Sequence, residues 1–576
     1  MCAINGFTWE DKALITRMDR VLKHRGPDDT GIYLDKGISL GHNRLSIIDL
    51  SKKGHQPMSD REGTLTIVYN GEIYNFKDIR RELEKKGYSF ASGSDTETLL
   101  YAYKEYGSSC LQMLNGMFAF AVWDSEKKEL FLARDRLGIK PLYYHHDDND
   151  LIFSSELKAI LEHDIDRVLD SKSLSSFLTY RFIADDNTML KGIKKLPPGH
   201  HLLYKDGKVR ISRYWSLDWT VKKKSLAHYT KKTGDLLKDA VEKRLLSDVP
   251  LGVFLSGGLD SSLITAINTK LRDEPVKTFS VGFGHESDEL SWASKVAGEL
   301  STDHKEILLD YGTLTRSIPD IVWHMDEPHT DPTMFPLYFL AEEARKDVTV
   351  INTGEGADEL FSGYLHYKAG SPKLGLVPSV LRKKAYSYYY QPFKPDERRR
   401  LLGTKTQKAR VLDNYLSREG DMLNNILAFD IDHELPNWQL TRVDRMTMAH
   451  GMEARVPFLD HRMVELASGM PPGFKQHGLI GKHVLKEASQ AYLPKEIIYR
   501  KKQGFTTPLH AWAKDSLADY AQSAIRDMPS GIFNKRFVDR LAENNRSDKQ
   551  MFARKSYQLM IIALFSSWHG QYIERS

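Results

Sequence analysis

Position 2 of the chain holds a cysteine, and this place gives the residue the means to do chemistry. We expect Met1 to be removed because Cys2 is small, which leaves a thiol and a free α-amine on one residue. An α-amine has an ordinary pKa of about 7.7 to 8.0, so near neutral pH it can accept the proton of its own thiol. Position alone is equally compatible with a small buried cysteine, so the neighbouring motifs have to decide between the two readings.

A second set of residues able to do chemistry lies in the middle of the chain. Residues 256–262 read Ser-Gly-Gly-Leu-Asp-Ser-Ser after an apolar run, and residues 353–364 form another glycine-rich, acidic turn after a second apolar run. Small residues let backbone N–H groups converge on an anion, and the following helix N-terminus adds its positive end. The Gly-Lys-Ser/Thr ending of a Walker A loop is missing. A plain strand-to-helix loop and a helix N-cap are the alternatives at these two turns.

The elements that must position these residues change character near residue 210. Before it, β-rich runs at 64–69, 118–123, 130–133 and 151–154 alternate with turns, and helical periodicity is limited to 12–24, 78–86 and 97–106. A Leu-Pro-Pro-Gly break at 196–199 precedes a hairpin at 204–211 that turns at Asp206-Gly207. The pattern predicts a sheet-dominated domain with helices packed on it, over residues 1–210.

Beyond this boundary, long amphipathic helices, the first at 226–246, alternate with short apolar strands at 251–255, 278–283 and 348–352. Each strand leads into a glycine-rich or acidic turn and then a helix. This order indicates a parallel, doubly wound sheet that binds ligands at the carboxyl ends of its strands. After about residue 370 the chain is mostly helical, and we interpret basic stretches such as 398–400 as solvated helix surface. Residues 211–576 are therefore predicted to form an α/β domain with added helices.

The composition narrows the class of protein. A length of 576 residues predicts two or three domains, and 82 basic against 77 acidic residues give +5, too little for a dedicated nucleic-acid binder. The two cysteines, Cys2 and Cys110, exclude a disulfide framework and favour the cytoplasm. No export signal begins the chain, and the apolar cluster at 559–565 is too short to span a bilayer, so we expect no membrane partner. Cys110 is expected to be a buried residue ahead of a core strand.

Five short motifs in the first hundred residues occur in an order that points to a family. They read Met-Cys-Ala-Ile at 1–4, Arg-Gly-Pro-Asp at 25–28, Gly-His-Asn-Arg-Leu-Ser-Ile at 41–47, Tyr-Asn-Gly-Glu-Ile-Tyr-Asn at 69–75 and Ser-Gly-Ser-Asp-Thr-Glu at 92–97. Together they resemble the glutaminase domain of N-terminal-nucleophile amidotransferases, over most of the first 160 residues. The resemblance implies a type 2 glutamine amidotransferase with the αββα sandwich of the Ntn hydrolases. Ala3 departs from the pattern, in which glycine is common.

The resemblance implies roles that fit the chemistry of glutamine hydrolysis. Glutamine carries an α-carboxylate and an α-ammonium, so its pocket needs a fork-shaped cation and an anion, implied to be Arg44 and Asp95. Attack by the Cys2 thiolate develops a negative oxygen that needs preorganised donors, implied to be Asn70 and Gly71. An isolated Asn-Gly pair is more often a hairpin turn, but here the neighbouring motifs agree. The residues implied for glutamine binding are Arg44, Leu45, Asn70, Glu72 and Asp95.

The turn at 256–262 resembles the pyrophosphate loop of ATP-pyrophosphatases. With the turn at 353–364 and the motifs at 444–460 and 481–487, the whole chain resembles the glutamine-hydrolysing asparagine synthetase family. The resemblance implies an adenine nucleotide alpha hydrolase-like domain that cleaves ATP at its α-phosphorus into AMP and pyrophosphate. A carboxylate has no competent leaving group, because oxide cannot leave. Transfer of AMP onto the carboxylate supplies one. The residues implied at the nucleotide are Leu255, Ser256, Gly257, Gly258, Asp260, Ser261, Val281, Thr353 and Gly354.

The same resemblance implies Lys482 and Glu355 as catalytic residues of the second site. Lys482 would stabilise charge at the phosphates and the adenylate, whereas a solvated helix lysine is the alternative, and Arg442 is a weaker candidate for the role. Asp260 and Asp358 are the expected Mg²⁺ ligands, because Mg²⁺ prefers one or two carboxylates with phosphate oxygens and water. Residues 500–505 match the family's C-terminal pattern without a role that we can assign. ATP and Mg²⁺ are thus the expected cofactors, and the family implies a homodimer.

Two sites in one chain predict two reactions in series. We hypothesise that ammonia released at Cys2 crosses an internal passage and attacks a carboxyl-adenylate in the second domain. Aspartate is the first choice of acceptor. Another carboxylate, such as a uronic acid of a surface polysaccharide or a peptide, stays open because residues 325–336 lack the arginine found near a Thr-Thr-Ile sequence in the best-known asparagine synthetases. A β-lactam synthetase relative would normally lack the nucleophilic cysteine, and a tRNA thiolation enzyme should show a basic module or a cysteine pair.

Overall fold

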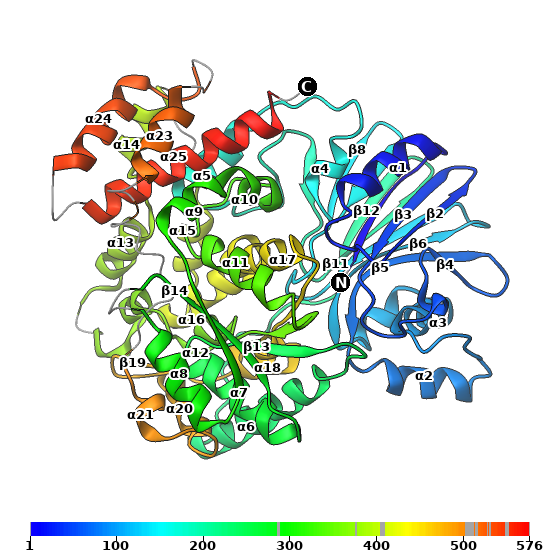
Figure 1. Cartoon of the computed structure of the whole chain (residues 1–576), viewed down its shortest axis with the longest axis horizontal. Coiled ribbons are helices and arrows are strands. Elements are labelled where there is room, and N and C mark those ends of the chain that lie inside the picture. Colours follow the sequence, from blue (N-terminus) through cyan, green and yellow to red (C-terminus); the bar gives the residue numbers. More distant parts are fainter. Residues whose placement is uncertain are drawn as a thin grey trace.

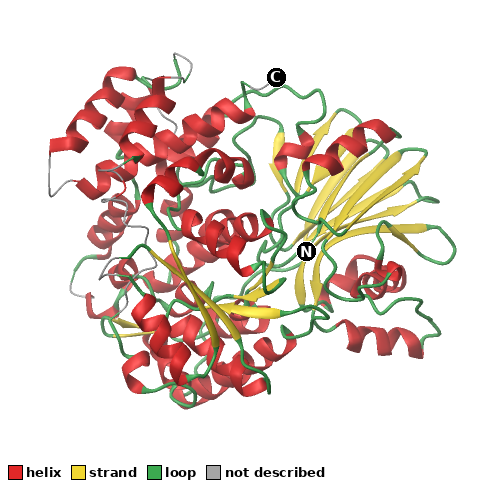
Figure 2. Ribbon diagram, viewed as in Figure 1, coloured by secondary structure: helices red, strands yellow, loops and turns green. Residues whose placement is uncertain are grey.

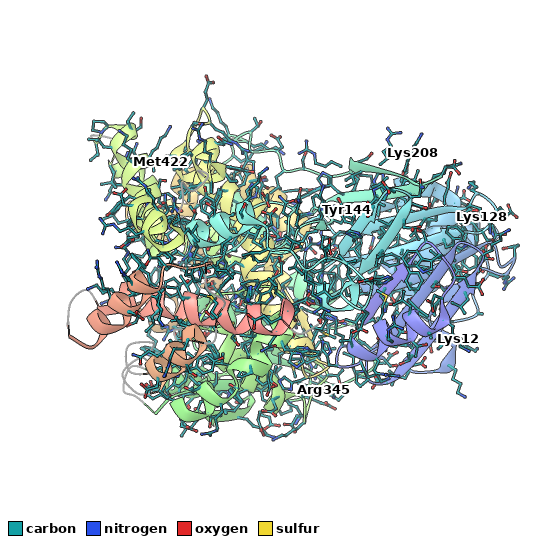
Figure 3. The ribbon with its side chains drawn as sticks, turned by 90° about the horizontal axis from the view of Figure 1, so that it is seen from above. Lys12, Lys128, Tyr144, Lys208, Arg345 and Met422 are labelled. Carbon is teal, nitrogen blue, oxygen red and sulfur yellow. The ribbon has the colours of Figure 1, made fainter. Side chains whose placement is uncertain are left out.

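A computed structural model of the chain describes residues 2–284, 288–374, 377–403, 409–501, 512, 516–526, 528, 531–547 and 552–574. Two parts lie side by side, a sheet-rich N-terminal part and a larger helix-rich part around a second sheet (Figure 1). Figure 2 shows the contrast, with the long strands on one side of the molecule and most helices on the other. Seen from above, Lys12, Lys128 and Lys208 mark the first part and Met422 the far side of the second (Figure 3).

The N-terminal part is a sandwich of two antiparallel six-stranded sheets. Their strand orders are β10-β8-β9-β1-β3-β2 and β12-β11-β7-β6-β5-β4. The first sheet consists of β1 (Ala3–Phe7), β2 (Asp29–Asp35), β3 (Ile38–Arg44), β8 (Tyr143–Asp147), β9 (Asp150–Ser154) and β10 (Ile193–Lys195). The second consists of β4 (Met58–Ser59), β5 (Leu65–Ile73), β6 (Gly116–Asp124), β7 (Glu129–Arg134), β11 (His200–Lys205) and β12 (Lys208–Arg213). The four β-rich runs noted in the sequence are β5, β6, β7 and β9.

Helices cover both outer faces of the sandwich. α1 (Lys12–Val21) and α4 (Leu157–Ile160) pack on the first sheet, and α2 (Phe76–Lys85) and α3 (Asp95–Tyr106) on the second. Apolar side chains such as Ile4, Val68 and Leu132 fill the space between the sheets. The predicted αββα sandwich is confirmed. The predicted hairpin is β11–β12, whose Asp206 and Gly207 have φ of +49° and +73°, as a tight two-residue turn requires.

Two strands that carry site residues were not evident in the sequence. β1 and β3 are buried along their whole length, including the polar residues Asn5, His42 and Asn43. Because both faces of these strands are covered, the alternation of polar and apolar residues that marks a half-buried strand is lost. Asn5 is accommodated because its Nδ2 donates to Asp19 Oδ1 of α1 at 2.8 Å.

The larger part is built around a parallel sheet with the strand order β15-β14-β13-β16-β17. These strands are β13 (Leu251–Phe254), β14 (Lys277–Gly282), β15 (Asp303–Leu308), β16 (Val350–Asn352) and β17 (Glu453–Arg455). α7 (Leu259–Leu271) follows β13, and α12 (Ala357–Phe361) follows β16. β13 and β16 are neighbours in the sheet. The predicted parallel sheet is confirmed, and both glycine-rich turns lie at the carboxyl ends of adjacent strands.

Helices enclose this sheet and reach the contact with the sandwich. They include α6 (Leu226–Lys243), α8 (Leu290–Glu299), α10 (Ile318–Met325), α11 (Met334–Ala344) and α25 (Phe552–Tyr572). A π-helix at Asp430–Gln439 leads directly into α17 (Leu440–Met448). α17 lies in the middle of the molecule, between the other helices and the sandwich (Figure 1). It is therefore placed to contact both parts.

Expectations about buried and exposed residues had different outcomes. The interpretation of residues 398–400 as solvated surface is wrong for Arg398, which is buried in α14 (Pro395–Leu402) and donates to Phe393 O at 2.7 Å and Gln391 Oε1 at 2.9 Å. Residues 391–393, just before the helix, fold over this side chain and accept the hydrogen bonds of its Nη1. Cys110 is fully buried ahead of β6, as predicted. Within the described residues, no helix is long and apolar enough to cross a membrane.

Candidate active sites

Cys2 lies at the start of β1, deep in the contact between the two sheets. Its backbone N–H donates to Asn70 Oδ1 of β5 at 3.1 Å, and its carbonyl accepts from Arg25 Nε at 3.2 Å. Only 7% of the residue is exposed. Met1 lies outside the described residues, so its removal stays a prediction. Removal would turn the nitrogen that faces Asn70 into the α-amine.

A pocket opens beside Cys2 and brings together residues predicted to bind glutamine. Arg44 comes from the end of β3, Gly71 and Glu72 from β5, and Asp95 from the start of α3. The pocket is also lined by Leu45, Ile47, Ile48, Gly54, Gln56, Tyr69, Ser94, Thr96 and Glu453. Three separate elements of the sandwich therefore supply the nucleophile, the cation and the anion of one site.

Neighbouring groups fix the orientation of Arg44 and Asp95. The Arg44 guanidinium donates to three backbone carbonyls of the loop at residues 48–51, at 2.6 to 3.3 Å. Asp95 Oδ2 accepts from Tyr69 Oη at 2.8 Å and from the Ile73 N–H at 3.0 Å. Burial raises the pKa of Asp95 to about 6, against the pull of these hydrogen bonds. At neutral pH Arg44 and Asp95 thus present a cation and an anion to the pocket, which suits the carboxylate and ammonium of an amino acid.

Asn70 and Gly71 lie inside β5 rather than in a turn, which removes the hairpin alternative for this pair. Asn70 Oδ1 accepts the Cys2 N–H, while its buried Nδ2 has no hydrogen-bond partner among the described residues. An unpaired buried donor costs about 1–3 kcal/mol, so its presence beside a nucleophile fits a donor kept for an oxyanion. Gly71 is needed for space, since a Cβ there would lie 2.2 Å from Met117 O.

Burial acts against the ionised form of both Cys2 and Glu72. It raises the pKa of the Cys2 thiol, while a hydrogen bond from the Leu45 backbone and the Arg44 charge lower it. Burial and the adjacent Asp95 also raise the pKa of Glu72 well above its ordinary value, and Arg455 opposes them. The thiol is therefore held neutral until a base removes its proton. The α-amine freed by loss of Met1 would be such a base on the same residue.

The second domain contributes to this pocket, which sequence reasoning missed. Glu453 of β17 lines the pocket, and Arg455 of the same strand pairs with Glu453 at 2.6 Å and with Glu72 at 3.3 Å. The buried Arg455 guanidinium also donates to the backbone carbonyls of Arg244 and Leu246, at 2.9 and 2.6 Å. No periodicity or spacing connects residues 72 and 453. The contact exists because β17 is the edge strand of the parallel sheet on the side that meets the sandwich.

Two loops meet at the carboxyl ends of β13 and β16. Gly257 has a φ of +66°, and a Cβ there would lie 2.5 Å from the backbone carbon of Trp292, so the turn into α7 requires glycine. A Cβ on Gly354 would lie 3.0 Å from Asp260 Cβ and 3.1 Å from Ser261 N. The two predicted phosphate-binding turns are therefore in contact. At the ends of β13, β14 and β16 lie the other residues predicted at the nucleotide, Leu255, Ser256, Gly258, Val281 and Thr353.

Lys482 joins these two loops. Its Nζ lies 2.5 Å from Asp260 Oδ2 and 2.6 Å from Asp358 Oδ1. The residue is 6% exposed and has a φ of +58° just before α20 (His483–Ser489), so it is not a solvated helix lysine. Burial opposes its charge, but the two carboxylates raise the pKa of Lys482 above its ordinary value. One buried ammonium therefore faces both loops.

Asp260 and Asp358 suit a divalent cation that is also bound to phosphate. Within the described residues, no group of three or more histidine, cysteine, aspartate or glutamate side chains is arranged to hold a metal ion by itself. A pair of carboxylates fits Mg²⁺, which takes its other ligands from phosphate oxygens and water. In this structure the same pair binds the Lys482 ammonium.

An arginine of α17 contacts residues 325–336, the stretch that has no arginine of its own. Arg442 Nη1 donates to Asp331 and, at 2.7 Å, to Thr333 Oγ1, while Nη2 donates to Glu355 at 2.5 Å. Burial raises the pKa of Glu355, and the Arg442 charge opposes the rise. Glu355 directly follows Gly354, so this cluster borders the phosphate loops. The sequence predicts Arg442 only as a weaker candidate for charge stabilisation at the phosphates, and nothing in its spacing shows that α17 faces this stretch.

Arg500 is a further group at the phosphate loop. Its Nη2 pairs with Glu289, and the same nitrogen would lie 3.7 Å from a Cβ placed on Gly258. No role followed from the match at residues 500–505, and residues 502–505 lie outside the described part of the chain. The structure brings this arginine to a loop whose shape suits an anion.

A nucleophile pocket on an αββα sandwich and a phosphate loop on a parallel sheet define a two-domain glutamine amidotransferase. One family model, described as asparagine synthase, matches residues 232–570, and another, described as glutamine amidotransferase domain, matches residues 1–215. The chain belongs to the glutamine-hydrolysing asparagine synthetase family of carbon–nitrogen ligases.

Curated relatives resemble the chain over nearly its whole length. It is 33% identical to asparagine synthetase [glutamine-hydrolyzing] 1 of Bacillus subtilis, over 99% of this chain and 95% of that protein. It is 31% identical to asparagine synthetase B [glutamine-hydrolyzing] of Escherichia coli, over 92% of this chain and 86% of the relative. A protein named amidase chry2, of Gibberella zeae, is 28% identical over 93% of this chain and 90% of its own length.

Proposed function

We propose that the chain adenylates a carboxylate with ATP and amidates it with ammonia released from glutamine at Cys2. With aspartate as the acceptor, the products are asparagine, glutamate, AMP and pyrophosphate. The contact of Lys482 with Asp260 and Asp358 carries this proposal, because it joins two glycine-rich loops at adjacent strand ends around one buried cation. A fixed cation at a phosphate loop stabilises the negative charge that develops when pyrophosphate leaves.

In the first site, the Cys2 α-amine takes the thiol proton, and the thiolate attacks the side-chain amide carbon of glutamine. Asn70 Nδ2 and the Gly71 N–H donate to the oxyanion that forms. The amide nitrogen leaves as ammonia once it has gained a proton from the α-ammonium. Water then cleaves the thioester, which releases glutamate and restores the thiol. Arg44 and Asp95 hold the glutamine backbone groups throughout.

In the second site, an oxygen of the acceptor carboxylate attacks the α-phosphorus of ATP and pyrophosphate leaves. Mg²⁺, held by Asp260 and Asp358, would neutralise phosphate charge when bound. Lys482 donates to the departing phosphates or the adenylate. Ammonia attacks the acyl carbon of the adenylate, AMP leaves with its electron pair, and Glu355 takes the proton that the new amide loses.

Arg442 and Asp331 favour an amino acid as the acceptor. They present one cation and one anion beside Glu355, which is the pair that an α-carboxylate and an α-ammonium require. A uronic acid or a peptide carboxylate is the second candidate, since this arginine comes from α17 rather than from residues 325–336. The likeness to a protein named as an amidase supports testing acceptors beyond aspartate.

Mass spectrometry of the products, with ATP, Mg²⁺, glutamine and a panel of carboxylic acids, tests the proposal. Pyrophosphate and AMP should form with aspartate, and asparagine should accumulate. If pyrophosphate and AMP form with another acid but not with aspartate, that acid is the acceptor. Cys2→Ala should lose synthesis from glutamine and keep synthesis from added ammonium. Loss of both activities in a folded variant would contradict two sites in series.

We further propose that residues 1–210 produce ammonia and residues 211–576 use it, in a homodimer located in the cytoplasm. The pocket at Cys2 and the loops at β13 and β16 support this division, since each set of reacting groups is carried by its own sheet. Size-exclusion chromatography with light scattering at micromolar protein tests the dimer.

A further inference from the structure

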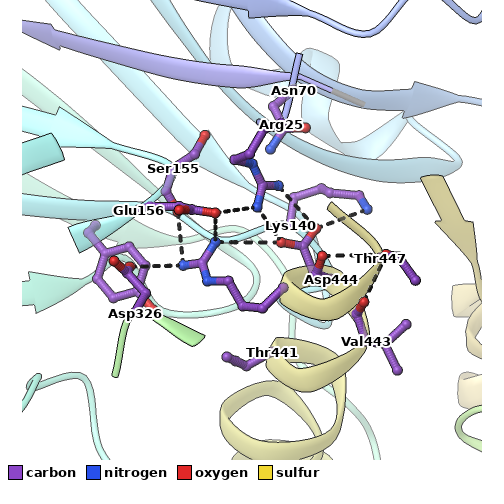
Figure 4. A network of polar contacts seen from close by, with 12 residues as sticks. Arg25, Asn70, Lys140, Ser155, Glu156, Asp326, Thr441, Val443, Asp444 and Thr447 are labelled. Atoms are coloured by element: carbon purple, nitrogen blue, oxygen red, sulfur yellow. Dashed lines mark hydrogen bonds and ion pairs between the residues drawn. The ribbon is translucent and has the colours of Figure 1, made fainter. Parts of the chain in front are cut away.

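A buried network of charged side chains joins the Cys2 site to the second domain (Figure 4). Arg25 has no exposed surface, and its Nε donates to the Cys2 carbonyl at 3.2 Å. Its Nη1 contacts Glu156 Oε1 and Asp444 Oδ2, both at 2.8 Å, and its Nη2 reaches Asp444 Oδ1 at 3.2 Å. Asp444 belongs to α17. The Cys2 backbone is therefore held by Arg25, and Arg25 makes a bidentate contact with Asp444 across the domain contact.

The next residue of α17 supports the same strand at a second point. Arg445 donates to Glu156 Oε1 and to the Ser155 carbonyl, both at 3.1 Å. Ser155 in turn accepts the Ile4 N–H through Oγ at 3.0 Å and donates its own N–H to Ile4 O at 2.9 Å. Consecutive residues of one helix thus fix β1 at Cys2 and at Ile4.

The charges in this network are balanced only when α17 is in place. Burial would raise the pKa values of Glu156 and Asp444, but the surrounding cations keep both below their ordinary range. Glu156 is shared, because His24 at 3.2 Å, Lys158 and Arg445 contact it as well as Arg25. Asp444 also lies 3.6 Å from Lys140 Nζ and from Arg445 Nη1, but it accepts hydrogen bonds from two nitrogens of Arg25 and so sets the plane of the guanidinium. Without Asp444, Arg25 would depend on Glu156, whose carboxylate also contacts His24, Lys158 and Arg445.

We propose that Asp444 of the second domain is a positioning residue for the Cys2 nucleophile, acting through Arg25. The glutaminase site is then complete only while α17 is docked against the sandwich. Glu453, which lines the glutamine pocket from β17, places a second group of that domain at the same site. This inference rests on the proposed role of Cys2 and adds a residue that does not touch glutamine.

Asp444→Asn keeps the shape of the side chain and removes its charge. We expect kcat for glutamate release from glutamine to fall by about tenfold or more, because a small displacement of a nucleophile is costly. KM for glutamine should stay unchanged, because Arg44 and Asp95 are not in the network. Alkylation of Cys2 by iodoacetamide, followed by peptide mass spectrometry, should slow in parallel. A purely structural role would not separate kcat from KM in this way.

Tyr143→Phe is the matched control. Tyr143 Oη donates to Glu327 Oε2 at 3.1 Å, a buried hydrogen bond that crosses the same domain contact without touching Cys2 or Arg25. This variant should keep both the parent kcat and the parent alkylation rate. An equal loss in Tyr143→Phe and Asp444→Asn would overturn the inference, since any damage to the contact would then suffice.

Arg25→Lys is the second variant, and it keeps the cation while removing the two-pronged contact. It should show the same fall in kcat and alkylation rate as Asp444→Asn, and it decides the matter if Asp444→Asn fails to fold. Parent-like kcat and alkylation in the folded variants would overturn the inference. Continued glutamine hydrolysis by Cys2→Ala would instead overturn the proposed function, so the two failures are distinguishable.

Discussion

Replacing Lys482 by methionine removes a positive charge that Asp260 and Asp358 share. The lysine Nζ lies 2.5 Å from one carboxylate and 2.6 Å from the other, so the two oxygens are at most about 5 Å apart. Two unit charges at that separation repel by about 3 kcal/mol at an effective dielectric constant of about 20. The carboxylate side chains are only 19% and 15% exposed, so water screens little of this repulsion.

We therefore expect Lys482→Met to lower the melting temperature by roughly 5 °C. The same free energy, lost from the transition state, would slow pyrophosphate release by about a hundredfold or more. Glutamate release should stay unchanged, because Lys482 belongs to the other site. Millimolar Mg²⁺ should restore part of the melting temperature, since a divalent cation can replace the missing charge between the carboxylates.

Lys486→Met, on the same helix, is the control for this prediction. The Lys486 Nζ lies over the Tyr499 ring, 5.7 Å from its centroid, and the Asp260 charge acts on it less than burial and Lys482 do. This variant should therefore lose much less of the melting temperature and of the rate than Lys482→Met. Differential scanning fluorimetry and a pyrophosphate assay give the two readouts. A Lys482→Met protein with parent-like stability and pyrophosphate release would refute the reasoning. A melting temperature of that variant indifferent to Mg²⁺ would refute the metal assignment alone.

Burial places the pKa of Asp95 at about 6. KM for glutamine should therefore rise as the pH falls through 6, because the carboxylate becomes protonated. A constant KM in initial-rate assays between pH 5 and 8 would contradict the role of Asp95. Gly71→Ala would bring a Cβ to 2.2 Å from Met117 O, and we expect glutaminase kcat to fall about tenfold or more while ammonium-dependent synthesis persists. Lys475 is buried with Asn424 Oδ1 at 2.9 Å, and burial lowers its pKa from 10.5 to about 7. Between pH 7 and 10.5 the unfolded chain therefore binds more protons than the folded one. Lys475→Met should raise the free energy of unfolding by a few kcal/mol at neutral pH, and this gain should disappear as the pH approaches 10.5. Denaturant titrations at the two pH values measure the difference.

Periodicity predicted the strands whose environment leaves a pattern in the sequence. β5, β6, β7 and β9 of the sandwich and β13, β14 and β16 of the parallel sheet all coincide with apolar runs between turn signals. β1 and β3 left no such pattern, because they are buried on both faces and carry polar residues paired inside the protein. The burial of Arg398 was also not predicted. A basic run on a helix is usually solvated, and Arg398 is buried here because residues 391–393 fold over its side chain.

The sequence by itself determined which candidate reacting groups the chain carries. A cysteine at position 2, an Arg44 and Asp95 pair for an amino acid and a Ser-Gly-Gly turn after an apolar strand depend on residue type and local spacing, which a single chain displays directly. The tertiary structure alone decided which distant groups complete each site. Glu453 at the Cys2 pocket comes from β17, and Asp444 beside Arg25 and Arg442 beside Glu355 come from α17. Their positions follow from how one sheet edge and one helix pack against the sandwich, and long-range packing of this kind leaves no periodic signal in the sequence.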